Sequence, residues 1–337
     1  MSQVHHAVVK YVASGDTLVI RPLSTANLSD SDQRISFNYV TAPKLARPSS
    51  TDEPYAFESR EYLRKRLIGQ EISYTIDFQI PKSGRCICTV FLGRDSENII
   101  ESLLSEGLVK LRPRSVKNAT DTGTYQRLVL LDEKAQEERR GLHSADPASA
   151  HVRDLTWSLD DPKEFLDQHR SPLNGIVESI RDGNTVRCLL VPNYHLVSIQ
   201  LTGITCPTLK QQANAIPSID DSLPIEAKCF IEDRLLQREV TVVLHGVNHR
   251  NLVGSVMHPN GNIALYLLKE GLVRCVDWSL VFLPQAERER YRAAEKHAYD
   301  HRLKIWNRHA VAVSHLGFDM DGGDTSRDSP SEEYEVQ

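Results

Sequence analysis

The chain has 337 residues, about twice the usual length of one domain, and its 40 Lys and Arg against 45 Asp and Glu give a formal net charge of −5. Apolar residues make up 40% and charged residues 25%, which excludes a disordered or collagen-like chain. No run of about 18 apolar residues and no signal-peptide pattern is present, so we expect neither a membrane span nor secretion.

The acidity is concentrated at one end of the chain. Residues 319–337 hold seven acidic residues and one arginine, so the remaining chain has a net charge of +1. We expect residues 313–337 to be a disordered acidic tail, because they lack hydrophobic periodicity. A nearly neutral body permits nucleic-acid binding only through local basic clusters.

In chain order, the first half predicts strands and helices that alternate in a fixed sequence. The expected elements are a β-hairpin over 8–20 that turns at Gly15-Asp16, a strand at 34–40, a helix with Ser59, Leu63 and Leu67 on one face, strands at 71–78 and 86–92, a short helix before residue 106, and a charged helix at 126–140. We expect Gly15 and Gly183 to supply the positive φ of a tight turn.

The second half repeats this plan. Five blocks recur in the same order, each displaced by 164 or 168 residues: 8–17 as 176–185, 40–43 as 204–207, 66–72 as 234–240, 98–99 as 262–263, and 106–109 as 270–273. The closing helix of the second copy is expected at 285–302. The chain is therefore an internal duplication.

Three strands, a helix and two further strands are typical of the five-stranded OB-fold barrel, which binds oligonucleotides on one face. The fold class predicted is α+β, with two such barrels and flanking helices. The predicted divisions are repeat 1 at 1–146, a linker at 147–172, repeat 2 at 173–312, and the tail at 313–337.

Several short motifs resemble staphylococcal-nuclease-like domains: Ser14-Gly15-Asp16-Thr17, Val40-Thr41-Ala42-Pro43, Gly84-Arg85 and Lys304-Ile305-Trp306. With Met257-His258-Pro259-Asn260-Gly261-Asn262 and Cys275-Val276-Asp277-Trp278-Ser279, the chain resembles the first two nuclease-like repeats of the Tudor-SN family. The resemblance implies OB-fold barrels of staphylococcal-nuclease type, RNA binding, a role in the RNA-induced silencing complex and in transcriptional coactivation, and endonuclease activity. It also implies further repeats and a Tudor domain, whereas this sequence covers two repeats.

The resemblance implies a catalytic set of two carboxylates that hold Ca²⁺, a glutamate base and two arginines. In repeat 1 only Asp16, as metal ligand, and Arg85 match this set, and they are the candidate catalytic residues. Thr41, Lys44 and Ser36 replace the second carboxylate, the base and the other arginine. Ca²⁺ is the one cofactor implied.

Repeat 2 departs further from the implied set. Asn184 and Thr205 replace the two carboxylates, Thr208 the base, and Gln200 one arginine, while the other arginine aligns near Val253. Neutral oxygens do not supply the charge that holds the ion, and a lysine at the base position does not accept a proton. We expect the parental mechanism to be lost in both repeats.

Two basic clusters are candidate nucleic-acid contacts. Arg64, Lys65 and Arg66 lie on the first predicted helix, and Arg112, Arg114 and Lys117 lie in a loop with few acidic neighbours. A solvated helix face is the alternative for the first cluster, whereas the second is the better phosphate-binding candidate.

The leading hypothesis is an RNA-binding module, for single- or double-stranded RNA. One alternative is a Ca²⁺-dependent endoribonuclease with a site rebuilt around Asp16 and Arg85. The other is a scaffold for protein partners in silencing or transcription complexes. Six scattered cysteines and the absence of a membrane span indicate a cytoplasmic protein that also enters the nucleus.

Overall fold

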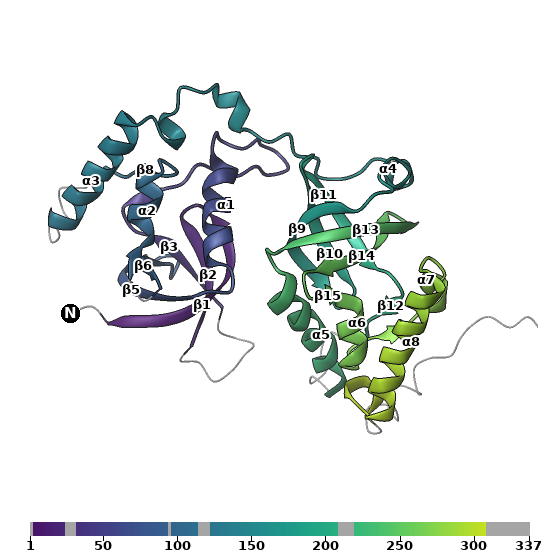
Figure 1. The fold of residues 1–337 in the computed structure, drawn as a ribbon. Helices are drawn as coiled ribbons and strands as arrows, with labels where there is room; N and C mark the ends of the chain where they lie inside the picture. The colour runs from purple at the N-terminus through teal and green to yellow at the C-terminus, as the bar shows by residue number, and fades with distance from the viewer. Residues whose placement is uncertain (1–2, 24–31, 94–95, 114–121, 208–218, 308–337) are drawn as a thin grey trace, which may run out of the picture.

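Two barrels lie side by side and are joined by a segment that arches between them (Figure 1). The computed structural model describes residues 3–23, 32–93, 96–113, 122–207 and 219–307. The predicted acidic tail lies outside these residues.

In repeat 1, five strands close into a barrel in the order β3-β2-β1-β5-β6, and β6 pairs back to β3 in parallel. The strands are β1 Val4–Ser14, β2 Thr17–Pro22, β3 Gln33–Phe37, β5 Glu71–Gln79 and β6 Cys86–Leu92. Two breaks of register in the β1–β2 pairing bend β1, as closure of a small barrel requires. The predicted strand at 34–40 ends earlier, at Phe37, because Tyr39 has a φ of 62° that interrupts the extended backbone.

Short strands and three α-helices complete the described part of repeat 1. The short strands are β4 Val40–Thr41, β7 Glu97–Asn98 and β8 Lys110–Leu111. The helices are α1 Ala56–Leu67, α2 Ile99–Ser105 and α3 Thr122–Glu137. The Asn98 side chain caps α2 by accepting the Ile100 N–H at 3.0 Å, which accounts for the repeated Asn-Ile pair.

Repeat 2 has the same topology, with strand order β11-β10-β9-β13-β14 and a parallel β11–β14 closure. Its strands are β9 Leu173–Asp182, β10 Thr185–Val191, β11 His195–Leu201, β12 Ile204–Thr205, β13 Glu239–Asn248, β14 Asn251–His258, β15 Gly261–Asn262 and β16 Arg274–Cys275. Its helices are α5 Ile219–Leu235, α6 Ile263–Lys269, α7 Asp277–Leu280 and α8 Gln285–Asp300. The α+β class and the two barrels are thus confirmed.

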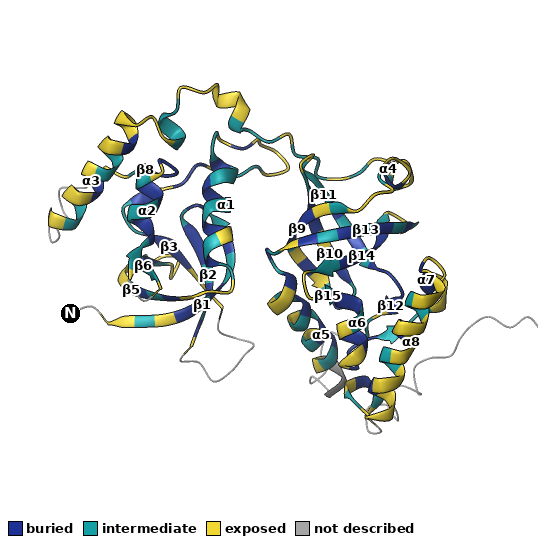
Figure 2. Cartoon of the chain, in the orientation of Figure 1, coloured by how far each residue is buried: buried dark blue, intermediate teal, exposed yellow. Residues whose placement is uncertain are grey.

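Each barrel has its own apolar core, seen as dark blue strand faces in Figure 2. The predicted helix face is buried in both repeats, since Leu63 and Leu67 of α1 and Ile231 and Leu235 of α5 are all fully buried. These helices pack on the first strand of their own barrel. The period-four pattern therefore identified the core face of each helix.

The predicted linker contains structure of its own. Within it, Pro162–Gln168 form helix α4, and Phe165 and Leu166 belong to the core cluster of repeat 2. Asp161 caps this helix by accepting the Lys163 N–H at 2.7 Å. The second half of the predicted linker is therefore packed on the second barrel.

Candidate nucleic-acid interface

The β1–β2 turn of repeat 1 holds Asp16 in a fixed orientation. One carboxylate oxygen accepts hydrogen bonds from the hydroxyls of Ser14 at 2.6 Å and Thr17 at 3.1 Å. The other accepts the Ala42 N–H at 3.1 Å. The Asp16 side chain is 16% exposed, so one side of the carboxylate still reaches solvent.

The glycine before Asp16 has a different role from the one expected. Neither Gly15 nor Gly183 has a positive φ. A Cβ on Gly15 would lie 1.8 Å from the Ser59 hydroxyl oxygen, and one on Gly183 would lie 2.2 Å from the Cys206 sulfur. The expectation of a positive φ was wrong, because these positions require glycine for close packing of the turn.

Arg112 is the cation that faces Asp16. Its Nη2 lies 3.7 Å from Asp16 Oδ2, and its Nε donates to the Thr41 hydroxyl at 2.5 Å. The β4–β8 pairing sets this geometry by placing Thr41 opposite Lys110, two residues before Arg112. The Arg112 side chain is 44% exposed, so part of its guanidinium, which has five N–H donors, is open to solvent.

The residues around Asp16 do not fit a calcium ion. Ca²⁺ takes about six to eight oxygen ligands, several of them charged. Among the described residues at this turn, Asp16 is the one carboxylate. Two hydroxyls and a backbone N–H already donate to it, and the Thr41 oxygen accepts from Arg112. Across the described ranges, no group of three His, Cys, Asp or Glu is arranged to hold a metal. The positive charge at this position belongs to Arg112.

The other parental positions of repeat 1 are dispersed. Ser36 is buried and lies 3.2 Å from the Thr17 hydroxyl. Lys44 is 83% exposed and lies 3.7 Å from Glu53. Arg85 is exposed at the start of β6, and within the described part of the chain it has no ion-pair partner. The structure brings together Asp16 and Thr41, whereas Lys44 faces solvent.

The corresponding position in repeat 2 is uncharged. Asn184 accepts a hydrogen bond from the Thr185 hydroxyl at 3.1 Å, where Asp16 accepts from Thr17. Thr205 pairs with Arg274 as Thr41 pairs with Lys110, so the residue that matches Arg112 is Val276. Thr208, which replaces the base, lies outside the described residues.

Two further positions of repeat 2 serve the fold. The Gln200 oxygen accepts a hydrogen bond from the Asn248 amide at 2.9 Å, and Val253 is fully buried. Val253 is not available to a ligand, and the Gln200 oxygen is already bonded. Repeat 2 therefore keeps none of the parental charges.

The basic cluster predicted on α1 does not form one surface. Arg64 is 4% exposed and is enclosed between the repeats, where it bonds Glu61 and Glu239. Burial works to lower its pKa, but these two carboxylates outweigh burial and raise it. Arg64 is therefore not placed to contact a phosphate.

The remaining members of the two predicted clusters differ in position. Arg66 bonds both carboxylate oxygens of Glu97, at 2.7 and 2.6 Å, while Lys65 is exposed. Arg114 and Lys117 lie outside the described residues. Lys110, which sequence analysis did not select, is exposed and two residues before Arg112, so alternation along β8 gives the two cations one face. The spacing Lys110-Leu111-Arg112 in the sequence could have indicated that the two cations share a face.

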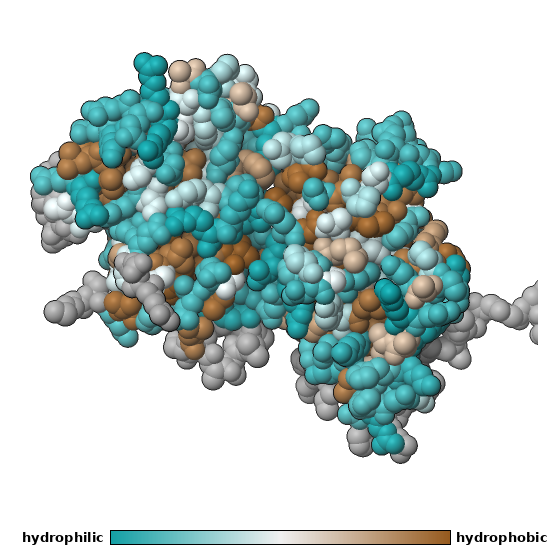
Figure 3. Space-filling model, viewed as in Figure 1, coloured by the Kyte–Doolittle hydropathy of each residue, from teal (hydrophilic) through white to brown (hydrophobic). Residues whose placement is uncertain are grey.

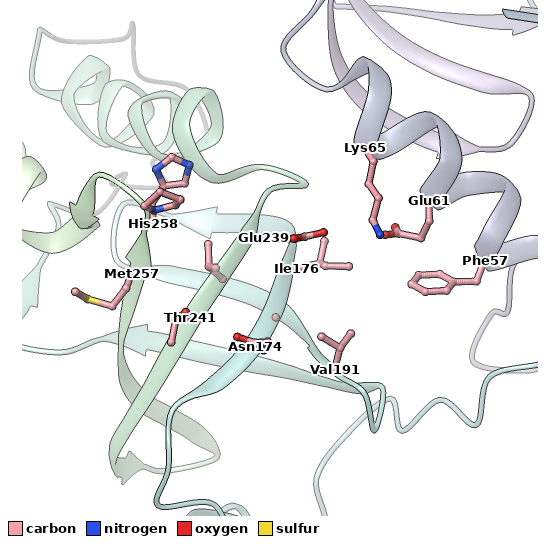
Figure 4. A pocket seen from close by; sticks show the side chains of 13 residues that line it. Phe57, Glu61, Lys65, Asn174, Ile176, Val191, Glu239, Thr241, Met257 and His258 are labelled. Carbon is pink, nitrogen blue, oxygen red and sulfur yellow. The ribbon is translucent and has the colours of Figure 1, made fainter.

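A cleft of about 590 Å³ lies where the two repeats meet. Helix α1 contributes Phe57, Glu61 and Lys65 to it, and the facing strands of repeat 2 contribute Ile176 and Glu239, among others (Figure 4). Apolar residues gather on this face beside the junction (Figure 3). Lys65 is thus a rim residue of the inter-repeat cleft and is separated from Arg112.

The family model described as staphylococcal nuclease homologue matches the chain twice, over residues 34–145 and 198–308. Each match falls on one of the two barrels, with its degenerate site at the β-hairpin turn. The chain belongs to this family. The predicted resemblance to the Tudor-SN family is confirmed by its relatives.

The relatives of this nuclease-homologue chain are much longer proteins. It is 39% identical over 312 residues to "Staphylococcal nuclease domain-containing protein 1" of Drosophila melanogaster. The matched region covers 89% of this chain and 33% of that protein. It is 31% identical over 351 residues to "Ribonuclease TUDOR 1" of Arabidopsis thaliana, with coverage of 88% and 35%. A fission-yeast relative shares 34% over 325 residues, with coverage of 93% and 36%. The chain therefore spans about a third of these relatives.

Across the described residues, no helix of this nuclease-homologue chain is both long and apolar enough to cross a membrane.

Proposed function

We propose that the chain is an RNA-binding module that contacts backbone phosphates without a metal ion. The contact between Arg112, Asp16 and Thr41 carries this proposal. A guanidinium held on one side by a carboxylate and a hydroxyl loses little further freedom when its free N–H groups meet a phosphate. Lys110 extends the same face, and Arg114 and Lys117 follow in the sequence.

Membership of a nuclease family supports nucleic acid as the ligand. Phosphate binding depends on local clusters of Lys and Arg, because the body of the chain is nearly neutral. A small number of phosphate contacts gives modest affinity and a weak base preference. The cellular setting is proposed to be silencing and transcription complexes in the cytoplasm and the nucleus.

Salt titration tests this function. Binding of fluorescent single- and double-stranded RNA to the full chain is followed by anisotropy between about 50 and 200 mM salt. The log of the binding constant should fall linearly with log salt, because each phosphate contact releases a counterion. A binding constant that does not change with salt would contradict the proposal.

Endoribonuclease activity is the second candidate, because Asp16 and Arg85 are retained and two relatives from Arabidopsis thaliana are named Ribonuclease TUDOR 1 and 2. It predicts RNA cleavage that EDTA abolishes and that Asp16→Asn or Arg85→Gln removes. Cleavage that is unchanged in both variants would exclude a site rebuilt on these residues. A stable protein partner without RNA binding at low salt would instead favour a scaffold.

A further inference from the structure

Side chains on the first helix of each repeat reach the first strand of the other repeat. On α1, Arg60 Nη2 donates to both carboxylate oxygens of Glu178 on β9, at 2.7 and 2.8 Å. On α5, Asp233 forms an ion pair with Lys10 on β1. Arg60 and Glu178 are nearly enclosed, with side chains 7% and 14% exposed. Two reciprocal ion pairs thus span the interface.

The backbone shows that these positions correspond between the repeats. The Gly69 N–H bonds the Val9 carbonyl at 2.9 Å, and the Gln237 N–H bonds the Val177 carbonyl at 2.7 Å. Both members of the second pair lie 168 residues after those of the first, as in the sequence repeat. The helix and first strand of the two barrels therefore superpose in register across the interface.

At two of three corresponding positions, the charges are reversed. The strand position holds Lys10 in repeat 1 and Glu178 in repeat 2, and the helix position of Lys65 holds Asp233 in repeat 2. The third position, Arg60, corresponds to Lys228 and keeps its sign. Lys10 therefore meets the acidic Asp233, and Glu178 meets the basic Arg60.

Gln237 adds a contact that only repeat 2 supplies. It is fully buried, and its side-chain amide accepts the Val12 N–H at 2.6 Å and donates to the Val12 carbonyl at 2.9 Å. Its own carbonyl accepts from Arg64 Nη1 at 2.8 Å. The matching residue in repeat 1 is Gly69, which has no side chain to make this pair of bonds.

A second copy of the repeat 1 face would fit poorly. Repeat 1 against itself would bring Lys10 to Arg60 and Lys65 and would leave the Val12 backbone groups without Gln237. Like charges placed together at a contact, and buried polar groups without partners, are the means by which interfaces reject wrong partners.

We propose that the repeat 1 half of the inter-repeat face is a recognition surface that accepts the repeat 2 face through charge and Gln237 and rejects a second copy of repeat 1. The partner that fits repeat 1 carries an acidic residue at the strand position and on the helix, and a glutamine after the helix. This code pairs repeat 1 with repeat 2 and keeps the repeat 1 faces of two chains from pairing with each other.

A nicked form of the full chain tests this code. A protease site inserted after the exposed Ala145 is cut once the chain has folded, and the two halves are followed by size-exclusion chromatography with light scattering. The Arg153–Asp52 ion pair and the other linker contacts stay the same in every variant, so differences between variants report the face itself. Circular dichroism checks that each variant is folded.

The single-sided and double-sided charge reversals have distinct expected results. The parent halves should co-elute as a 1:1 complex, and Lys10→Glu with Arg60→Glu should weaken the complex at least ten-fold. Adding Glu178→Arg and Asp233→Lys should restore most of that loss. The matched control is Lys134→Glu, an exposed residue paired with Glu138 on α3, which should change nothing. Equal affinity in parent and reversed chains, no rescue by the second pair of reversals, or self-pairing of the parent repeat 1 half would overturn the proposal.

Discussion

The two hairpin turns differ in charge, although the backbone around them is the same. In repeat 1 the carboxylate of Asp16 has Arg112 beside it, whereas in repeat 2 the amide Asn184 and the apolar Val276 occupy the corresponding positions. The anion and the cation are thus both present in one repeat and both absent from the other. A carboxylate without a cation would carry uncompensated charge, so we infer that the two positions are coupled.

The two repeats show two different results of losing most of the nuclease-type catalytic groups. Repeat 2 has become neutral, and its former ligand positions now bond neighbouring side chains. Repeat 1 keeps a charged position in which a protein side chain provides the cation. We therefore expect phosphate binding to depend on repeat 1 more than on repeat 2.

The largest effect is expected from the interface that joins the two regions. Gln237→Ala leaves the Val12 N–H and C=O buried without partners, which costs about 2 to 4 kcal/mol of unfolding free energy. Urea unfolding measures this loss. Gln70→Ala, at an exposed neighbour of the corresponding loop in repeat 1, is the control and should stay within about 0.5 kcal/mol. Equal losses in the two variants would contradict the assigned role of Gln237.

Removal of the guanidinium tests the charged turn itself. Arg112→Gln should lower RNA affinity about five-fold, or about 1 kcal/mol, because one half-exposed phosphate contact is lost. The salt slope should fall by about 0.7 for single-stranded RNA. Arg127→Gln, which removes an exposed arginine paired with Glu101, should leave both unchanged. A loss of the same size in both variants would mean that only net charge matters.

Transfer of the charged pair to repeat 2 sharpens the comparison. Asn184→Asp combined with Val276→Arg should raise RNA affinity about two-fold, since it adds one paired cation at the corresponding turn. Asn184→Asp alone should lower affinity, because an unpaired carboxylate repels phosphate. The same anisotropy assay measures both variants. An increase caused by the single substitution would show that the two positions are independent.

The smallest effect concerns pH and again distinguishes the repeats. Burial lowers the pKa of His245, which bonds Ser255 at 3.0 Å, whereas repeat 1 has the exposed Asp77 at the corresponding bulge. The folded state takes up this proton less readily than the unfolded state, so stability falls as pH drops below about 6.5. His245→Gln should flatten that part of the urea-midpoint profile. A profile with unchanged slope would exclude His245 as the cause.

The duplication and the barrel fold could be predicted from sequence, because core positions such as Leu63 and Ile231 repeat at a fixed displacement and at helical spacing. The burial of Arg64 could not be predicted, because it depends on contact with the second barrel. Helix periodicity gives no information about that contact. The contact of Arg112 with Asp16 joins residues far apart in the chain. It follows from pairing of two-residue strands, which leave almost no pattern in a sequence. Gly15 was assigned to the right turn for the wrong reason.

Calcium titration by isothermal calorimetry tests the central claim most directly, namely that Arg112 takes the place of the metal ion beside Asp16. The account predicts no saturable heat at millimolar Ca²⁺ for the full chain, and the same trace for Asp16→Asn. One-to-one Ca²⁺ binding that Asp16→Asn abolishes would contradict it.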